Sequence, residues 1–596
     1  MKKFIIYALA LVLGTMTFTS CEDMFCDFLD KQPSNELTKD EVLSNWSLIQ
    51  QFHNDTYNFL LNGENRVNRS WMDAATDLAE SAIQTSGVRT TFNIGNYYGS
   101  GAAAELTSPW ESRWRGIRKC NITIQTLEND TANKLRPADV KLDLYKTQKL
   151  NTISEARFLR AWFQWEMFLR YGTLPIVTDV LDPNGDLLAS KYTTRPTTKE
   201  YIDFILSELK DCEKGLKTKK EVEDATYAGH ASQPAARALY CRIMLYMASP
   251  RYSKESGITW QQAADAAKSF IDDYGENAVD GFHLETRTNG GVAAYNNAWM
   301  LTTYSDQNPE VIFFRNDPAV GWSAVADDTP VGEGGNGGTC PSQNLIDMYD
   351  MADGSAPFTK YDATGAPVYT NGQPTVNTAS GYSDQKMWEN RDPRFAATVL
   401  MQGATWNGRS INIVYGQGDN PIGNQNATPT GYYLKKYMPE TILSGNHAGT
   451  AKRLWKLFGY NEILLDYAEA LNEVDYAANR SKVCSLLDEI RHRAGITGNV
   501  ADRTDLNSQE TMRNFIHKER TIELAFEEQR WWDVRRWNVA GEALGRDIYG
   551  ITVAKDGTIT RKVAQTRSWQ DRFYLYPIPE SEVWKIGNDF QNDGWK

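Results

Sequence analysis

The sequence predicts a mostly α-helical protein, in which a helical solenoid scaffold carries an inserted, loop-rich subdomain with short strands. Apolar residues recur at helical spacing from about residue 43 to 274 and again from 458 to 537, a pattern typical of packed amphipathic helices. Between these blocks, residues 281–450 hold 21 of the chain's 43 glycines, with many Pro, Asn and Thr residues. Such a composition indicates turns and loops, so the two helical blocks flank the loop-rich segment.

The first residues have the composition of an export signal. Two lysines precede an apolar run at residues 4–18, and a Thr-Ser pair precedes Cys21. A basic start, an apolar run too short to span a membrane and small residues before the cut site are typical of a secretory signal peptide. Small residues followed by Cys also look like a bacterial lipobox. We therefore expect residues 1–20 to be a signal, Cys21 to be acylated and residues 21–40 to be a tether; the alternative is an ordinary signal with an incidental cysteine.

Residues 41–280 are expected to form the first part of the scaffold. The helix at residues 153–172 is the clearest, because Leu159, Phe163 and Met167 form one apolar row beside a second. A helix that is apolar over so much of its surface packs against neighbours on more than one face. Further helices are predicted at residues 110–127, 198–216, 234–248 and 259–274. Helix pairs with short links indicate a tetratricopeptide-like solenoid, although no strict repeat of about 34 residues is present.

Residues 281–457 are expected to be a loop-rich subdomain inserted in this scaffold. Its strand-like run is EVIFF, residues 310–314. Loops this long inside a compact domain are usually functional or disordered. Interleaved Trp and Tyr residues argue against disorder, so we expect loops that carry function on a rigid platform.

Residues 458–540 are expected to complete the scaffold with helices, followed by a tail, residues 541–596, that packs on it. One helical pattern covers residues 459–474, and a second runs from 511 to 538. The second contains RWWDVRRW, in which charged residues recur at spacings of three and four. This spacing favours a network of ion pairs that locks the last helix onto its neighbours.

Composition excludes several classes of function. A formal net charge of −13 argues against a nucleic-acid partner. The seven cysteines form no CxxC pair, so neither a disulfide framework nor a zinc site is indicated. No HExxH, GxSxG or P-loop sequence is present, and we expect no metal and no cofactor.

Several segments in order along the chain resemble the SusD/RagB family of outer-membrane lipoproteins. They are DFLDKQPSNEL (27–37), EARFLRAWFQWEMFLRYGTLPIV (155–177), PSQNLIDMYDMADG (341–354), NRDPRF (390–395), YNEILLDYAEALNE (460–473), KERTIELAFEEQRWWDVRRW (518–537) and YPIPESEV (576–583). The resemblance implies a tetratricopeptide scaffold with a loop-rich subdomain. It also implies a non-catalytic protein at the outer face of the outer membrane, which hands nutrients, usually glycans, to a TonB-dependent, SusC-like transporter.

The same resemblance places glycan-binding aromatic rings in two loops. The first corresponds to residues 92–106, with Tyr97 and Tyr98 beside a glycine, and the second to residues 315–328, with Trp322. Flat rings cover the CH faces of sugars, while a few polar groups bind hydroxyls. Weaker candidates are Trp388 and Trp406. Trp110 and Trp114 lie inside an apolar helical stretch, and we expect them in the core.

Two other functions remain open from the residues alone. Some members of the family serve peptide uptake, and such a protein would rely less on exposed rings. A surface glycoside hydrolase needs two carboxylates at a set separation, and 76 acidic residues offer pairs without a signature.

Overall fold

A computed structural model describes residues 38–98, 103–182, 184–286, 290–299, 308–440, 442 and 449–596. The predicted signal peptide, the acylation site Cys21 and nearly all of the predicted tether lie outside these residues. The described chain begins with two short helices, α3 (Lys39–Leu43) and α4 (Trp46–Asn54). Both begin at polar caps, since the side chains of Thr38 and Asn45 accept hydrogen bonds from backbone N–H groups, which stabilises a first helical turn.

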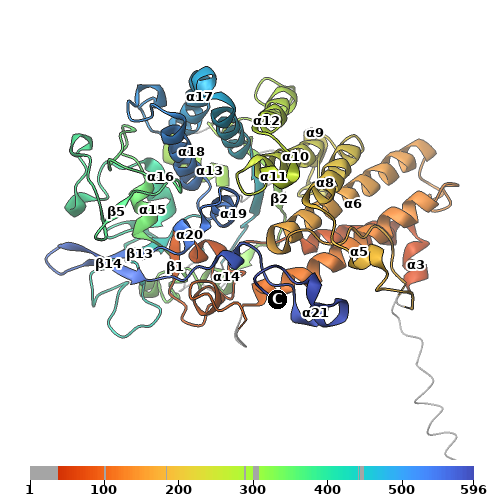
Figure 1. Cartoon of the computed structure of the whole chain (residues 1–596), viewed down its shortest axis with the longest axis horizontal. Coiled ribbons are helices and arrows are strands. Elements are labelled where there is room, and N and C mark those ends of the chain that lie inside the picture. Colours follow the sequence, from red (N-terminus) through yellow and green to blue (C-terminus); the bar gives the residue numbers. More distant parts are fainter. Residues whose placement is uncertain are drawn as a thin grey trace, which may run out of the picture.

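The scaffold is a series of packed helices, as predicted. Its members in the first half are α5 (Ser108–Asn129), α6 (Leu142–Tyr171), α8 (Thr198–Glu213), α10 (Gln233–Ala248) and α12 (Trp260–Tyr274), with short helices α7 (Ser190–Thr193), α9 (Lys219–Val222) and α11 (Ser253–Ser256) between them. In Figure 1 they follow one another from the right-hand end of the molecule toward its upper centre. The predicted fold class, mostly α with short strands, is confirmed.

Helix α6 is surrounded on several sides. It packs against α5 and α8, and Phe158 and Trp162 meet the ring of Phe313 from the loop-rich part at 5.4 and 5.7 Å between ring centroids. The approach of α5 depends on Gly116, because a Cβ there would lie 2.6 Å from the ring of Phe163. The helix also begins eleven residues before the predicted one, at Leu142, because its first three turns are largely polar and carry little of the apolar signal.

The second block of helices consists of α17 (Tyr460–Arg493), kinked at Asp475, α18 (Gln509–Glu523), α19 (Gln529–Arg536) and α20 (Ala540–Leu544). The predicted single helix over residues 511–538 is wrong. Phe526 and Glu528 have φ values of 59° and 60°, which break the helix. The break sends Glu527 toward Lys436 and Lys456, and Glu528 toward Arg66.

The predicted ion-pair network around RWWDVRRW is present and buried. Arg536 pairs with Glu469 of α17, Arg520 of α18 pairs with Asp533 of α19 at 2.8 Å, and Arg530 pairs with Asp77 at 2.7 Å. These contacts hold α19 against its neighbours.

The loop-rich part leaves and rejoins the scaffold at one ribbon. Strand β2 (Val311–Arg315), the predicted EVIFF strand, pairs antiparallel with β12 (Trp455–Gly459), which runs directly into α17. Between them the chain forms the short helices α14 (Trp322–Val325), α15 (Gln343–Met348) and α16 (Pro393–Thr398). The short strands there are β3 (Val320–Gly321), β4 (Thr339–Pro341), β5 (Tyr369–Thr370), β6 (Gln373–Pro374), β7 (Val399–Leu400), β8 (Thr405–Trp406), β9 (Arg409–Ser410), β10 (Tyr433–Leu434) and β11 (Thr450–Ala451). Each sheet within the described residues has two strands.

The C-terminal tail returns to the first helices. After the hairpin of β13 (Ile548–Val553) and β14 (Ile559–Gln565), the chain crosses back and forms α21 (Glu580–Ile586). The backbone N–H of Tyr576 donates to the carbonyl of Arg170 at 2.6 Å, at the end of α6. Figure 1 shows α21 and the C-terminus beside α5, although more than 400 residues of sequence separate the two.

Candidate functional site

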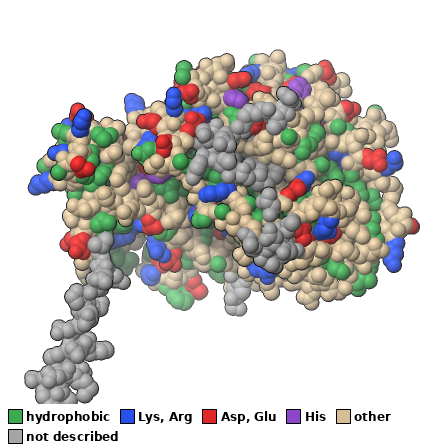
Figure 2. Space-filling view, turned by 180° about the vertical axis from the view of Figure 1, so that it is seen from behind, with side chains coloured by type: hydrophobic (Ala, Val, Ile, Leu, Met, Phe, Trp, Pro, Cys, Tyr) green, Lys and Arg blue, Asp and Glu red, His purple; other side chains and the backbone are tan. Residues whose placement is uncertain are grey.

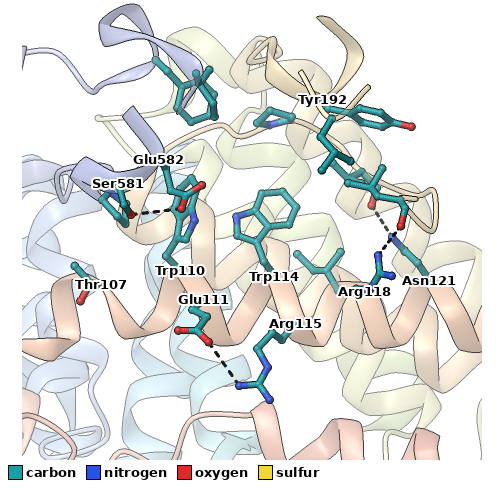
Figure 3. A pocket seen from close by; sticks show the side chains of 18 of the residues that line it. Thr107, Trp110, Glu111, Trp114, Arg115, Arg118, Asn121, Tyr192, Ser581 and Glu582 are labelled. Atoms are coloured by element: carbon teal, nitrogen blue, oxygen red, sulfur yellow. Dashed lines mark hydrogen bonds and ion pairs between the residues drawn. The ribbon is translucent and has the colours of Figure 1, made fainter. Parts of the chain in front are cut away.

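A groove of about 790 Å³ lies over one face of α5. We call it the α5 groove. Its floor is α5, one side is the segment from Pro175 to Tyr192, and the other is α21 with Pro579 and Phe590. Aromatic side chains contribute much of the lining: Trp110, Trp114, Tyr192 and Phe590. Figure 3 shows the Trp114 indole standing in the middle of the groove, above the helix axis.

Helical spacing places the floor residues. Trp110, Trp114 and Arg118 recur every four residues, so they lie in one row along α5. The helix begins at Ser108 with Pro109 in its first turn, where the missing N–H of proline costs nothing. Trp110 is almost fully buried against the edges of Tyr171 and Phe590, whereas Trp114 is only partly buried. The row therefore has one indole fixed in the core and one that faces the groove.

The side formed by residues 175–181 is fixed to α5 by hydrogen bonds. The Asn121 side chain donates to the carbonyls of Val177 and Asp179 at 3.0 and 3.2 Å and accepts from Arg160 at 2.8 Å. Arg118 donates to the carbonyl of Leu181 at 3.0 Å. Because these groups are engaged with the backbone, they set the width of the groove.

The opposite side is fixed through the tail. Arg195 donates to the carbonyl of Phe590 at 3.0 Å and to Oδ1 of Asn592 at 2.8 Å. The same guanidinium donates to the carbonyls of Thr173 and Tyr171 at 2.7 Å each. One partly buried arginine thus joins the end of α6 to the C-terminal tail, which forms this side of the groove.

Acidic groups are frequent along the rim. Glu111, Asp179, Glu580 and Glu582 line the groove, and Arg115 lies 3.7 Å from Glu111. Hydrogen bonds from Lys191 and Tyr192 lower the pKa of Asp179, so this carboxylate stays ionised and accepts hydrogen bonds. An apolar floor with carboxylate acceptors at its rim suits a neutral ligand rich in hydroxyl groups. It is poorly suited to an anion.

Two exposed rings lie on or beside the C-terminal tail, and neither of them lines the groove. Tyr98 is 54% exposed, and its hydroxyl donates to the carbonyl of Trp595 at 2.9 Å. Burial raises the pKa of Tyr98; the charge of Arg572 opposes this rise, and the charge of Glu580 adds to it. Trp584, on α21, is 77% exposed.

The structure separates the two adjacent tyrosines that the sequence proposed. Tyr97 is 4% exposed and stacks on Phe573 at 4.2 Å, with Trp595 and Phe92 against its other sides. A ring enclosed in this way has no open face for a sugar. Tyr98, the next residue, is more than half exposed and remains a candidate.

The proposed tryptophans lie away from the α5 groove. Trp322 begins α14 and packs partly buried against the main core, next to the β3–β11 pair. Trp406 is 1% exposed in β8. Trp388 is partly buried, and its indole N–H donates to the Tyr432 hydroxyl at 3.2 Å. Within the described chain, none of these three rings lines the groove.

Trp114 is the groove residue that sequence reasoning missed. Its row on α5 looks like a core stripe, and Trp110 confirms that expectation. Glu111 and Arg115, each directly after one of the two tryptophans, were a signal that the next face of the helix meets solvent. No local pattern in α5 could predict that residues 579–590 of the tail pack beside this helix and form the second side of the groove.

Metal and membrane-spanning features are not found in the described part of the chain. No group of three or more His, Cys, Asp or Glu side chains there is placed to hold a metal ion. No described helix combines the length and apolarity that crossing a membrane requires.

Comparison with known sequences identifies the family. A family model described as the SusD family matches residues 309–595, and one described as "Starch-binding associating with outer membrane" matches residues 27–245. The chain belongs to the SusD/RagB family, as its motifs indicated. Among curated relatives, SusD-like protein P2 of Formosa agariphila is 30% identical over 164 residues, which are 27% of this chain and 30% of that protein.

Solved structures share the fold. A SusD-like protein from Bacteroides fragilis has a TM-score of 0.71 at 24% identity, with 95% of this chain and 100% of that chain covered. A SusD-like carbohydrate binding protein from the same organism has a TM-score of 0.66 at 20% identity, covering 92% of this chain and 99% of that one. Surface glycan-binding protein A from Bacteroides fluxus has a TM-score of 0.56 at 18% identity, with coverage of 92% and 99%.

Proposed function

We propose that this protein is a non-catalytic, cell-surface lipoprotein that captures an oligo- or polysaccharide and delivers it to a SusC-like, TonB-dependent outer-membrane transporter. The α5 groove carries the proposal, with Trp114 as the stacking ring on its floor. Family membership supports it, because two structural relatives are described as binding carbohydrate or glycan. The family model named for association with the outer membrane supports the location.

The shape and chemistry of the groove favour a glycan. Figure 3 shows the indole of Trp114 presenting an apolar face in the groove, and the lining residues Glu580 and Glu582 supply hydrogen-bond acceptors on the α21 side. Stacking on a flat ring combined with hydrogen bonds to hydroxyls is how proteins hold neutral sugars. Tyr98, which is 54% exposed and lies outside the groove lining, is proposed as a second contact. Trp322 is proposed as a separate contact, on family position alone.

Carboxyl chemistry supports binding without cleavage. A glycosidase needs a general acid whose pKa is raised by an apolar pocket. Burial raises the pKa to about 7 for Glu64, Asp73 and Asp466. It also raises the pKa of Glu310, Asp328, Asp488, Glu489 and Glu528, and none of these eight residues lines the α5 groove. Incubation with a glycan panel checks this: release of new reducing ends would show a hydrolase instead.

Isothermal titration with the same panel tests the site. Trp114→Ala should weaken binding at least about tenfold, or about 1.4 kcal/mol, and Tyr98→Ala should weaken it less. Tyr415→Ala, at a 56% exposed position in the loop-rich part, is the matched control and should bind normally. Full affinity in Trp114→Ala, with a large loss in Trp322→Ala, would move the site to the loop that the family position indicates. Binding of oligopeptides and of no glycan would show that the ligand is a peptide instead.

The anchor and the partner need separate measurements. Mass spectrometry of the mature protein from its native membrane should find an acylated amino terminus at Cys21. Gentle extraction should recover the protein together with its transporter. An unmodified amino terminus would exclude the lipid anchor, and recovery of the protein alone would count against delivery to a transporter.

A further inference from the structure

One end of the scaffold combines exposed leucines with exposed lysines. Leu142, Leu144 and Leu150 of α6 are 43%, 51% and 54% exposed. Lys134, Lys141 and Lys146 lie near them in the sequence and are also exposed. We call these six residues the basic tip. Residues 131–150 contain five basic and two acidic side chains in a chain whose net charge is −13. Glu128 and Asp130, just before them, pair with Arg157 and Lys149, so the tip has a small local excess of positive charge beside the exposed Asp40 and Glu41 of α3.

The basic tip is held by its own small core. Trp46, Ile49, Leu127 and Tyr145 form a hydrophobic cluster apart from the main one, with Trp46 and Tyr145 edge to face at 4.9 Å. The Tyr145 hydroxyl donates to Asp130 at 2.5 Å. The exposed leucines are therefore displayed by an ordered helix end, and the cluster that supports them includes α4 from the beginning of the described chain.

The tip lies where the described chain enters the fold. The first described helix, α3, packs on α4, and Figure 1 shows α3 at the same end of the molecule as the outer ends of α5 and α6. If Cys21 carries the lipid, residues 22–37 must cover the distance from the bilayer to Thr38, which is at most about 60 Å even when fully extended. Figure 2 shows hydrophobic and basic side chains together at this end, with some acidic ones.

We propose that the basic tip rests on the membrane surface and contacts anionic lipid headgroups. Leucines beside lysines are the combination by which interfacial helices bind membranes, with the apolar side chains at the headgroup boundary and the ammonium groups near phosphates. In this orientation the basic tip faces the bilayer and the loop-rich part lies away from it. The inference rests on the proposed lipid anchor for its biological setting, but the surface chemistry can be tested without it.

The test uses the full mature chain with Cys21→Ser, which cannot be acylated, in flotation with vesicles. Binding should occur with vesicles containing phosphatidylglycerol, be at least fivefold weaker with pure phosphatidylcholine, and fall with added salt as screening increases. The double variant Leu142→Glu/Leu150→Glu should reduce binding at least fivefold. Ile422→Glu, at a 73% exposed position in the loop-rich part, is the matched control and should bind like the parent.

Equal vesicle binding by the tip variant and the Ile422→Glu control would overturn the inference. So would equal binding to neutral and anionic vesicles. Sedimentation of the parent as a dimer that the tip variant converts to monomer would assign the surface to a second copy instead. Glycan affinity is measured on the same samples and should be unchanged by the tip variant, so failure of the membrane contact and failure of glycan capture give different results.

Discussion

The helical scaffold and the loop-rich part satisfy their buried backbone groups in different ways. In α6, the N–H groups beyond the first turn bond within the helix, so the side chains from Ser154 to Tyr171 can be packed almost without solvent contact. In the loop-rich part, a side chain supplies the donors. The Arg391 guanidinium donates to the carbonyls of Met387, Tyr349 and Ile346 at 2.6, 2.6 and 2.7 Å. Buried carbonyls must find donors, and irregular backbone finds them in arginine side chains.

The same difference governs how the two regions are joined. Arg394 of α16 pairs with Asp392 at 2.7 Å and with Glu519 and Glu523 of α18 at 2.9 and 3.2 Å. Burial alone would raise the pKa of Asp350, but Lys518, Arg503 and Arg491 hold it below its ordinary value. Helices pack on one another through apolar area with buried ion pairs added, as between Arg520 and Asp533, whereas the segments around Asp350 and Arg394 are fastened to α17 and α18 by buried charge.

The largest expected effect is therefore in the charge network. Arg394→Leu leaves three carboxylates without their shared cation and should lower the free energy of unfolding by about 3–5 kcal/mol, measured by urea denaturation. Lys386→Leu is the control, because its ion pair with Glu389 at 3.3 Å is exposed, and such pairs contribute about 0–1 kcal/mol. A loss below about 1 kcal/mol in Arg394→Leu would show that charge does not fasten the loops.

The corresponding change in the scaffold removes apolar volume. Leu159 is fully buried in α6, and Leu159→Ala should cost about 3 kcal/mol through lost transfer energy and a cavity. Leu188→Ala, at a 59% exposed position, should change stability by less than about 0.5 kcal/mol. Equal effects in the two variants would contradict the idea that α6 is held by burial.

Lowering the pH tests His517, a residue that lies between the two regions. His517 of α18 stacks on Trp537 at 3.6 Å, and its Nδ1 lies 2.8 Å from the Ala363 carbonyl of the loop-rich part. Burial lowers its pKa from 6.5 to about 4. Between these values the unfolded chain binds a proton that the folded chain does not, so stability falls as pH drops from 6.5 to 4, by on the order of 3 kcal/mol from this group.

Denaturation across this pH range, together with the NMR titration of the imidazole, measures the effect. His517→Gln should flatten the decline between pH 6.5 and 4, while His492→Gln, at an exposed position on α17, should leave it in place. An imidazole at position 517 that titrates near 6.5 in the folded protein would contradict the assignment.

The smallest effect concerns the close approach of α5 and α6. Gly116→Ala places a methyl group 2.6 Å from the Phe163 ring, and overpacking should cost about 1–3 kcal/mol. Gly321→Ala is the control, since its nearest neighbour would be the Gly449 carbonyl at 3.7 Å. If Gly116→Ala stabilises the protein instead, as a helical Gly-to-Ala change otherwise would, the two helices have room to separate.

Helices of the scaffold were predictable because their apolar periodicity is local. The predictions for α8, α10 and α12 come within three residues of the observed ends. The break between α18 and α19 was not predictable, because the chain from Glu519 to Trp537 keeps helical spacing on both sides of it. The left-handed residues Phe526 and Glu528 are stabilised by ion pairs with residues distant in sequence. Glu527 pairs with Lys436 and Lys456, and Glu528 pairs with Arg66.

The sequence by itself determined the fold class, the family and the charged network of the last helices, since each is written in spacing or in motifs. Tertiary structure alone decided which aromatic rings face solvent. Tyr97 and Tyr98 are equivalent in composition and neighbours in the chain, yet Phe573 and Trp595 enclose the first and leave the second more than half exposed. Exposure depends on side chains from the far end of the chain, and no local sequence pattern shows where those side chains pack.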